Sequence, residues 1–477
     1  MITGADFIAR GWPQGPLIGT AIELANTLVR QGASAEDALE MVEAVRRAPD
    51  TFCEEDNACA TLAHAVRHWM NNQPREADGV REAPMHAPIW GREMIDDAAV
   101  AQLENAMRLP VTVAGALMPD AHVGYGIPIG GVVALDDAVA PYMVGVDIAC
   151  RMMMSIYPTS GDDAFGNPSE RERIKKIMRE ETRFGIGASF DRFARRDHDV
   201  LDDPDWDATK LLRHLKDKAA AQLGTSGTGN HFVDAGVLDV TDEQTATLGI
   251  PAGRYLAIMS HSGSRGVGAT IADTYSKLAQ KLTKLPDKLR HLAWLPMSTE
   301  AGSEYWTSME LAGRFASACH HTIHRAIGKR LGERPLLQVE NHHNYAWREQ
   351  WQGRDVYVHR KGATPAHEGV LGIVPGSQGT PSYIVVGKGS AASLNSASHG
   401  AGRVMSRTAA RNTIPKAARD HMLRQAGVEL MAGGIDESPQ VYKDIEAVLD
   451  VQKDLIERVA RFEPRIVLMA DDGKSED

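Results

Sequence analysis

The sequence predicts an α+β protein with a compact layered fold, in which mixed sheets surround a central cleft and a small helical module precedes the main domain. The apolar and charged fractions, 43% and 24%, are ordinary for a globular protein. The N-terminal part shows helical periodicity. Further along, short apolar runs alternate irregularly with helical stretches, which favours a layered fold over a barrel with a regular strand–helix rhythm.

Changes in composition divide the chain into three parts. Residues 1–70 form the predicted helical extension and residues 89–477 the main domain. Between them, residues 71–88 are rich in Asn, Gln, Pro, Gly and charged residues without an apolar period, which is typical of a linker.

The helical extension is predicted from periodicity and from helix start and stop signals. Apolar residues run from Leu17 to Val29 and end before Gly32, which favours a helix stop. Ser34 caps a second helix, with Asp37 placed three residues later as in a capping box. A third helix is indicated by apolar residues at i, i+4 and i+7, namely Leu62, Val66 and Trp69.

In the main domain the hydrophobic pattern predicts several short strands and a few helices. We expect strands over 111–113, 132–135, 143–146, 255–259, 356–358 and 383–386. We expect helices over 96–108, through most of 269–330, and over 442–459. The last of these has an apolar stripe made of Ile445, Val448, Leu449, Ile456 and Val459.

The charge of the chain limits the classes of partner. Its formal net charge is −11 and its pI is near 5.9, which argues against a protein whose whole surface coats nucleic acid. A local basic groove can still lie on an acidic body, so RNA is not excluded as a substrate. No apolar run approaches the roughly 18 residues of a membrane span, and the N-terminus lacks a secretory pattern.

The cysteines indicate the compartment. They are four in number, and none forms a CxxC pair: Cys53, Cys59, Cys150 and Cys319. We therefore expect no disulfide framework and a cytoplasmic protein.

Five potential metal ligands lie beside glycines or at predicted strand ends: Asp147, Cys150, His231, His261 and His343. Oxygen, nitrogen and thiolate donors together suit Mn²⁺, Co²⁺ or Zn²⁺ better than Mg²⁺. A thiolate can bridge two ions, so the set could serve two metals that act on one phosphate. Alternatively, each residue could be buried for structural reasons. A second cluster, His320, His321 and His324, lacks the glutamate of a zinc protease, and we interpret it as packing or surface.

A turn of small residues presents His399. A neutral imidazole is nucleophilic near pH 7, and Gly400 and Gly402 allow a bulky phosphate to approach closely. Arg403 and Arg407 add fixed positive charge and planar donors that suit phosphate.

Several further glycine-rich phrases could form anion-binding nests. With the turn after His399, they cover residues 225–230, 262–268, 361–364, 376–380 and 400–403. Together with Arg265, Arg360, Lys361 and Arg403 they indicate a polyphosphate or a nucleic-acid end as substrate. The alternative is that they are ordinary tight loops.

The order of these phrases resembles the RtcB family of RNA-splicing ligases. The matching phrases are Met-Pro-Asp-Ala-His-Val-Gly-Tyr-Gly, Val-Gly-Val-Asp-Ile-Ala-Cys, Gly-Thr-Gly-Asn-His-Phe, His-Ser-Gly-Ser-Arg-Gly, His-His-Asn-Tyr, Arg-Lys-Gly-Ala-Thr, Pro-Gly-Ser-Gln-Gly-Thr and Ser-His-Gly-Ala-Gly-Arg. The resemblance covers residues 90–465 and is highly specific. Residues 1–85 form an extension that the shorter bacterial members lack.

The resemblance implies a reaction: joining of an RNA 2′,3′-cyclic phosphate or 3′-phosphate end to a 5′-hydroxyl end, with GTP and two Mn²⁺ ions, in tRNA splicing or RNA repair. His399 would carry GMP covalently, and the GMP would then pass to the RNA 3′-phosphate. An archease-like activator is a further implied partner.

The resemblance also implies roles for the other residues. Cys150 would bridge the two ions, with Asp147 and His231 completing one site and His261 and His343 the other. Asp120 stands in the acidic position of the first phrase. The implied nucleotide-binding residues are Asn230, at the phosphates, and Asp234, Ser377, Ser382, Gly400, Ala401, Gly402, Arg403 and Tyr442.

Two residues depart from the family pattern at the implied guanine pocket. Met469 stands where a lysine is expected, and Asp234 stands where glutamate is more common. These departures keep open one alternative to a ligase, a metal-dependent phosphoesterase that opens cyclic phosphates. The presence of His399, Cys150 and the matched histidines counts against a further alternative, a non-catalytic protein that binds RNA ends.

Overall fold

A computed structural model describes residues 2–53, 58–71, 73, 75–77 and 79–471 of the chain. The described residues form two compact units. One contains the residues up to Arg75 together with Met297–Ser303, and the other contains Glu76–Pro296 together with the residues from Glu304 onward. Outside the described residues lie residues 1 and 54–57 of the predicted helical extension, residues 72, 74 and 78 of the predicted linker, and residues 472–477 of the predicted main domain.

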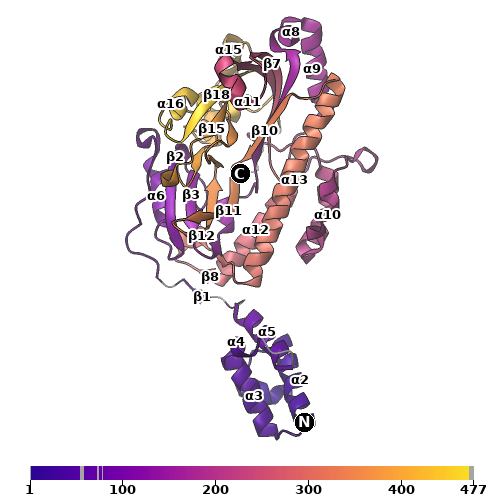
Figure 1. Cartoon of the computed structure of the whole chain (residues 1–477), viewed down its shortest axis with the longest axis vertical. Helices are drawn as coiled ribbons and strands as arrows, with labels where there is room; N and C mark the ends of the chain where they lie inside the picture. The colour runs from indigo at the N-terminus through magenta and orange to yellow at the C-terminus, as the bar shows by residue number, and fades with distance from the viewer. Residues whose placement is uncertain (1, 54–57, 72, 74, 78, 472–477) are drawn as a thin grey trace. The chain divides into compact units, whose positions relative to one another are not determined.

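The first unit is helical and is drawn in indigo in Figure 1. Ser34 caps a helix as predicted, because its side chain accepts the backbone N–H of Asp37. Phe7, Val42 and Leu62 are fully buried in the apolar core that the helices share. The helices are α1 (Gly4–Ala9), α2 (Pro16–Arg30), α3 (Ala35–Arg47), α4 (Pro49–Phe52) and α5 (Ala58–Asn71).

The second unit is built on a large mixed sheet. Its strands follow the spatial order β10 (Leu337–His342), β5 (Arg151–Ser160), β7 (Gly253–Ser262), β6 (Phe232–Val240), β18 (Ile456–Met469), β15 (Ser382–Gly387) and β14 (Leu371–Val374). These neighbours are antiparallel, whereas β17 (Glu429–Ala432) pairs in parallel with β18.

A smaller antiparallel sheet lies in the same unit. Its order is β11 (Asn344–Trp351), β12 (Arg354–Lys361), β3 (Ile129–Leu135) and β2 (Thr112–His122). Short pairs join β13 (Ala363–Pro365) to β16 (Ser396–Ser398) and β4 (Ala138–Val139) to β9 (Leu295–Pro296). Two further short strands are β1 (Arg75–Glu76) and β8 (Thr283–Lys284).

Some helices of the second unit pack against one face of the large sheet. Ile323 and Ile327 of α13, the long helix in Figure 1, pack in one buried cluster with Tyr157 and Ile258 of the sheet. The helices are α6 (Asp97–Ala106), α7 (Pro141–Val144), α8 (Gly161–Gly166), α9 (Pro168–Glu181), α10 (Lys210–Gln222), α11 (Thr245–Leu248), α12 (Arg265–Leu282), α13 (Glu300–Leu331), α14 (Arg407–Thr413), α15 (Lys416–Gln425) and α16 (Ile445–Asp450).

These elements confirm the α+β class. No helix among the described residues combines the length and apolar character needed to cross a bilayer. All four cysteines are described, and no disulfide joins any two of them.

Two predicted elements were wrong. The apolar run 143–146 is not a strand, because Pro141 starts the short helix α7 and Gly145 then leaves it at a φ of 105°. The helix predicted over 442–459 ends at Asp450. Ile456 instead begins β18, where it pairs with Gly387 of β15, so sheet pairing overrides the apparent helical stripe.

Candidate functional site

A pocket in the second unit collects side chains from the large sheet and from the loops at its edge. The sheet contributes Phe232, Asp234, Met259, His261, Val467 and Met469. The loops contribute Asp147, Cys150, Asn230, His343, Ser377, Gln378 and residues 399–403, with Glu437 and Tyr442 nearby. Residues far apart in the sequence therefore line one cavity.

Strand order explains why the metal-ligand candidates meet. The strands β10, β5, β7 and β6 are consecutive in the sheet. His343 directly follows β10, Cys150 directly precedes β5, His261 lies near the end of β7, and His231 directly precedes β6. The backbone N–H of His343 donates to the Cys150 carbonyl at 3.0 Å. Because neighbouring strands in this group are antiparallel, these four positions fall at one end of the sheet.

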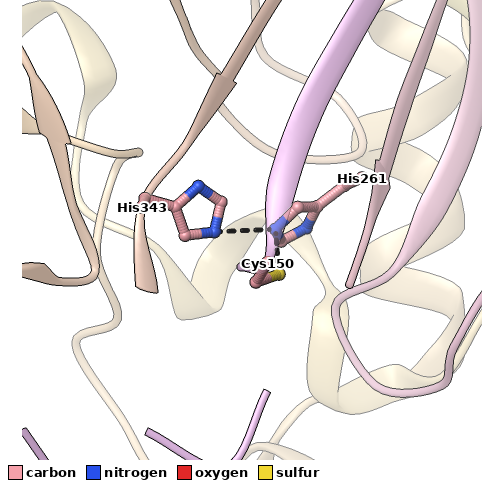
Figure 2. A group of neighbouring side chains, drawn as sticks. All are labelled: Cys150, His261 and His343. Atoms are coloured by element: carbon pink, nitrogen blue, oxygen red, sulfur yellow. Dashed lines mark hydrogen bonds between the residues drawn. The ribbon is translucent and has the colours of Figure 1, made fainter. Parts of the chain in front are cut away.

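Cys150, His261 and His343 form one buried donor set (Figure 2). The Nε2 atom of His261 lies 3.1 Å from the Cys150 Sγ and 3.2 Å from the Nε2 of His343. The Nδ1–H of His261 donates to the Asn230 carbonyl at 3.0 Å, so its Nε2 carries the lone pair. Burial, and after it the neighbouring charge of His231, lower the pKa of His261 to about 3, so the ring is neutral.

Asp147, Cys150 and His231 form a second buried donor set. The Nε2 of His231 lies 2.9 Å from the Asp147 Oδ2 and 3.4 Å from the Cys150 Sγ. Burial alone would raise the pKa of Asp147, but the hydrogen bond and charge of His231 outweigh it and lower the pKa. Cys150 belongs to both sets, so its sulfur could serve as a ligand in either one.

The backbone around Asp147 is adapted to this cluster. Ala149 has a positive φ of 57°, which is uncommon for a residue with a side chain and places Cys150 at the start of β5. A Cβ at Gly263 would fall inside the carboxylate of Asp147. The glycine predicted to cradle a phosphate therefore makes room for a carboxylate instead.

His399 lies beside the first donor set. Its ring centroid is 4.7 Å from that of His343. Its Nδ1 lies 2.8 Å from Oδ2 of the fully buried Asp120 on β2. The same oxygen accepts the backbone N–H groups of His399 at 3.1 Å and Gly400 at 3.3 Å. Since a carboxylate only accepts, Nδ1 carries the proton and the lone pair of His399 is on Nε2.

An arginine and two acidic residues build another wall of the pocket. Arg403 donates to Glu437 Oε1 at 3.3 Å and to the Asp436 carbonyl at 2.8 Å, and its guanidinium lies over the Tyr442 ring at 5.4 Å. The Tyr442 hydroxyl donates to Glu437. This network fixes the Tyr442 ring as a flat surface at the pocket wall.

Comparisons with known proteins identify the family of the chain. A family model described as tRNA-splicing ligase RtcB matches residues 102–470. The chain belongs to the RtcB family. It is 35% identical to the RNA-splicing ligase RtcB of Escherichia coli K12 over 409 residues, which cover 78% of this chain and 95% of that protein.

More distant relatives of this RtcB family member carry similar names. It is 31% identical to the tRNA-splicing ligase RtcB of Nanoarchaeum equitans over 442 residues, covering 79% of this chain and 92% of the relative. It is 30% identical to the RNA-splicing ligase RtcB of Mycobacterium tuberculosis over 430 residues, covering 76% and 98%.

The site residues that the sequence predicted are brought together around the pocket. His231 lies next to Asp147 and Cys150. The implied nucleotide-binding residues that line the pocket are Asn230, Asp234, Ser377, Ser382, Gly400, Ala401, Gly402, Arg403 and Tyr442.

Two of the arginines expected at a phosphate do not line the pocket. Arg360 is fully buried, and its guanidinium donates to Ser396 Oγ and Glu349 Oε1 at 2.8 and 2.6 Å. Arg265 is also buried and donates to Thr225 Oγ1 at 3.2 Å. Both bind protein groups, because a buried guanidinium needs fixed partners to offset its desolvation.

The cluster interpreted as packing has that role for its buried members. The Oγ of Ser260 lies 2.6 Å from Nδ1 of His320 and 2.7 Å from Nε2 of His324. His321 is instead half-exposed and lies 3.4 Å from Glu340. None of the residues in these three contacts lines the pocket.

Sequence reasoning missed the partners that hold the predicted residues. Asp120 was noted only for its place in the first phrase, and its bond to His399 crosses 279 positions of sequence. Glu437, buried against Arg403, lies in no recognisable phrase. A signal existed for Asp120, because a carboxylate inside a glycine-rich phrase often orients another residue. No signal existed for Glu437.

Proposed function

We propose that this RtcB family member is an RNA ligase that joins a 2′,3′-cyclic phosphate or 3′-phosphate end to a 5′-hydroxyl end. The observation that carries the proposal is the position of the His399 imidazole. Its ring packs against His343, a member of a donor set that shares Cys150 with a second set. The names of the relatives support RNA as the substrate.

The two donor sets fit two divalent cations. Asp147 and His231 would hold one ion, His261 and His343 the other, and the Cys150 thiolate would bridge them. Mixed carboxylate, imidazole and thiolate donors suit Mn²⁺, with Zn²⁺ or Co²⁺ as alternatives. When bound, the ions supply positive charge that polarises phosphate oxygens and stabilises the charge that develops there.

His399 supplies the nucleophile for the first step. Its Nε2 lone pair attacks the α-phosphorus of GTP, an N–P bond forms, the bond to the bridging oxygen breaks, and pyrophosphate leaves. Asp120 keeps the proton on Nδ1 and stabilises the positive charge that develops on the ring.

Transfer to RNA then releases the histidine. An oxygen of the RNA 3′-phosphate attacks the phosphorus bound to His399, the N–P bond breaks, and GMP becomes attached to the RNA end. The 5′-hydroxyl of the other RNA attacks the RNA phosphorus, loses its proton, and displaces GMP. At a cyclic end, water first adds to phosphorus and breaks the bond to the 2′-oxygen.

A groove of about 770 Å³ adjoins the pocket, and both cavities are lined by His122, Asp147 and Arg403. RNA ends bound in the groove would therefore lie next to the pocket. Tyr125 and Val123 line the groove and are 66% and 52% exposed. An exposed aromatic ring next to basic groups is the usual platform for an unpaired base.

The test is incubation with α-labelled GTP and Mn²⁺, followed by denaturing electrophoresis, with and without an archease-like protein. We expect an acid-labile label on the protein that is lost in His399→Ala, and ligation of RNA that carries the two required ends. No label with any nucleotide, combined with opening of cyclic phosphates, would overturn the ligase in favour of a phosphoesterase. Binding of RNA without either reaction would favour a non-catalytic RNA-end binder.

A further inference from the structure

The floor at one end of the pocket is apolar apart from a single carboxyl group. On this face of the sheet, Asp234 of β6 pairs with Met259 of β7 and Val467 of β18, while Phe232 pairs with Met469. All five side chains line the pocket. Asp234 therefore stands among thioether, aliphatic and aromatic groups, in the part of the pocket that the nucleobase would occupy under the proposed function.

Asp234 has no protein partner for its buried oxygen. The residue is 4% exposed, and its Oδ1 is buried without a hydrogen bond. Burial raises the pKa of Asp234 well above its ordinary value, and no neighbouring charge opposes the rise. Among the described residues no Lys, Arg or His forms an ion pair with it, so its burial favours the protonated, neutral form of the carboxyl.

Gln378 is a second unsatisfied polar group in the same pocket. It is 5% exposed, its Nε2 lies 3.1 Å from the Met469 sulfur, and its Oε1 is buried without a hydrogen bond. A thioether is a weak acceptor, so the amide can turn towards a better partner. Buried polar atoms without partners call for an explanation, and a ligand would supply partners to both groups.

The donor and acceptor pattern of these two groups suits either purine. Guanine offers the O6 acceptor and N–H donors at N1 and N2, whereas adenine offers the N6 donor and the N1 acceptor. Selection of guanine requires fixed acceptors opposite both N–H groups and a fixed donor opposite O6. A neutral carboxyl and a primary amide each donate and accept, and each can rotate to match the base.

We propose that the base end of this pocket accepts adenine as well as guanine, so that the chain binds ATP and GTP with affinities within about tenfold of one another, or ~1.4 kcal/mol. The inference rests on the proposed nucleotide-dependent function. Polar groups that can each donate or accept, set among apolar side chains, discriminate weakly between ligands of the same shape, which is the physical reason for the small ratio.

Substitutions at two positions separate this inference from a guanine-specific pocket. Met469→Lys would place an ammonium group diagonally across from Asp234, ionise the carboxyl, and create the two fixed acceptors that guanine requires. We expect it to favour GTP over ATP by more than tenfold, whereas Met469→Leu should keep the ratio within tenfold. Asp234→Asn keeps a group that donates and accepts, so it should also keep the ratio within tenfold.

The experiment measures the binding of α,β-methylene ATP and α,β-methylene GTP by isothermal titration calorimetry. It uses the full chain with Mn²⁺, and these analogues cannot transfer their nucleotide to His399. Affinities within tenfold, and a shift to GTP in Met469→Lys but not in Met469→Leu, support the inference. A preference of more than tenfold for GTP in the unchanged chain, or loss of GTP binding in Asp234→Asn, overturns it.

The outcomes also separate the inference from the function on which it rests. Binding of GTP alone overturns the base tolerance and leaves the nucleotide-dependent ligase intact. Failure of both analogues to bind, with Mn²⁺ bound normally, overturns the inference and the nucleotide step of the proposed function together.

Discussion

At the level of single residues, the chemistry of the site depends on which nitrogen of each imidazole keeps its proton. Asp120 accepts the Nδ1–H of His399, and the Asn230 carbonyl accepts the Nδ1–H of His261. In both rings the Nε2 lone pair is left for use, and the proposed reaction uses one for attack on phosphorus and the other for a metal. The same choice of tautomer therefore serves two roles.

Replacing Asp120 tests the first role. We expect Asp120→Asn to slow nucleotide transfer to His399 by about 10²-fold or more, because the amide neither stabilises the charged ring nor holds one tautomer. The measurement is the single-turnover rate of labelling, with metal content determined on the same preparation. Normal labelling with normal metal content would show that Asp120 does not orient His399.

Replacing Cys150 tests the second role. We expect Cys150→Ala to lose both ions, since its sulfur belongs to both donor sets, and His343→Ala to lose mainly one. Metal is counted by elemental analysis of purified protein. Cys319→Ala is the matched control, because Cys319 is buried in α13, outside both donor sets, where burial raises its pKa to about 11. Unchanged stoichiometry in Cys150→Ala would rule out the bridging role.

At the level of elements, the turn after β16 and the strand β2 are packed so closely that the turn requires glycine. Gly402 has a φ of 76°, and a Cβ there would fall inside the carbonyl group of Asp120. A Cβ at Gly400 would make only ordinary van der Waals contact, because the nearest atom would be 3.5 Å away. The two glycines of one phrase therefore differ in how well they tolerate an added side chain.

This difference predicts the stability of two matched variants. Gly402→Ala should lower the free energy of unfolding by about 2–4 kcal/mol through backbone strain and the displaced strand. Gly400→Ala should change it by less than about 1 kcal/mol. Denaturant unfolding of both proteins is the measurement, and equal losses would contradict the packing described for Gly402.

Elements were predictable from the sequence where a local signal decided them. The cap of α3 at Ser34 is set by neighbours in sequence, and the apolar run at 132–135 lies in β3 as expected. The prediction for the run at 143–146 was wrong because Pro141 starts a helix there. The prediction for the segment after Asp450 was wrong because Ile456 pairs with Gly387 in the sheet. A strand partner 69 residues away cannot be recognised from the hydrophobic pattern of a short stretch of sequence.

The candidate site was predictable as a set of residue types, and its geometry was not. Phrases rich in glycine identified Cys150 and His261, whereas their approach to 3.1 Å depends on β5 and β7 being neighbours. Strand order arises from tertiary packing, so periodicity does not contain it. Arg360 was misassigned for the same reason, because its partner Glu349 lies on the adjacent strand β11.

At the level of the whole molecule, the cluster of donors couples metal binding to folding. Asp147, Cys150 and three imidazoles are buried at one end of the large sheet, and they are contributed by segments from residue 147 to residue 343. An ion that binds the folded site and not the unfolded chain stabilises the fold by mass action. Without ions, the Nε2 atoms of His261 and His343 face each other, and at most one proton can lie between them.

Chelation is therefore expected to destabilise the whole second unit and not only to stop catalysis. Mn²⁺ at 100 times its dissociation constant should contribute about 2.7 kcal/mol per site to the free energy of unfolding. Thermal unfolding in EDTA and after return of Mn²⁺ measures this, and Cys150→Ala should respond to neither treatment because its ligand set is broken. A melting temperature that is the same with and without Mn²⁺ in the unchanged chain would mean that the five donors do not hold an ion in the folded state, and the proposed reaction would then need another source of charge at the phosphate.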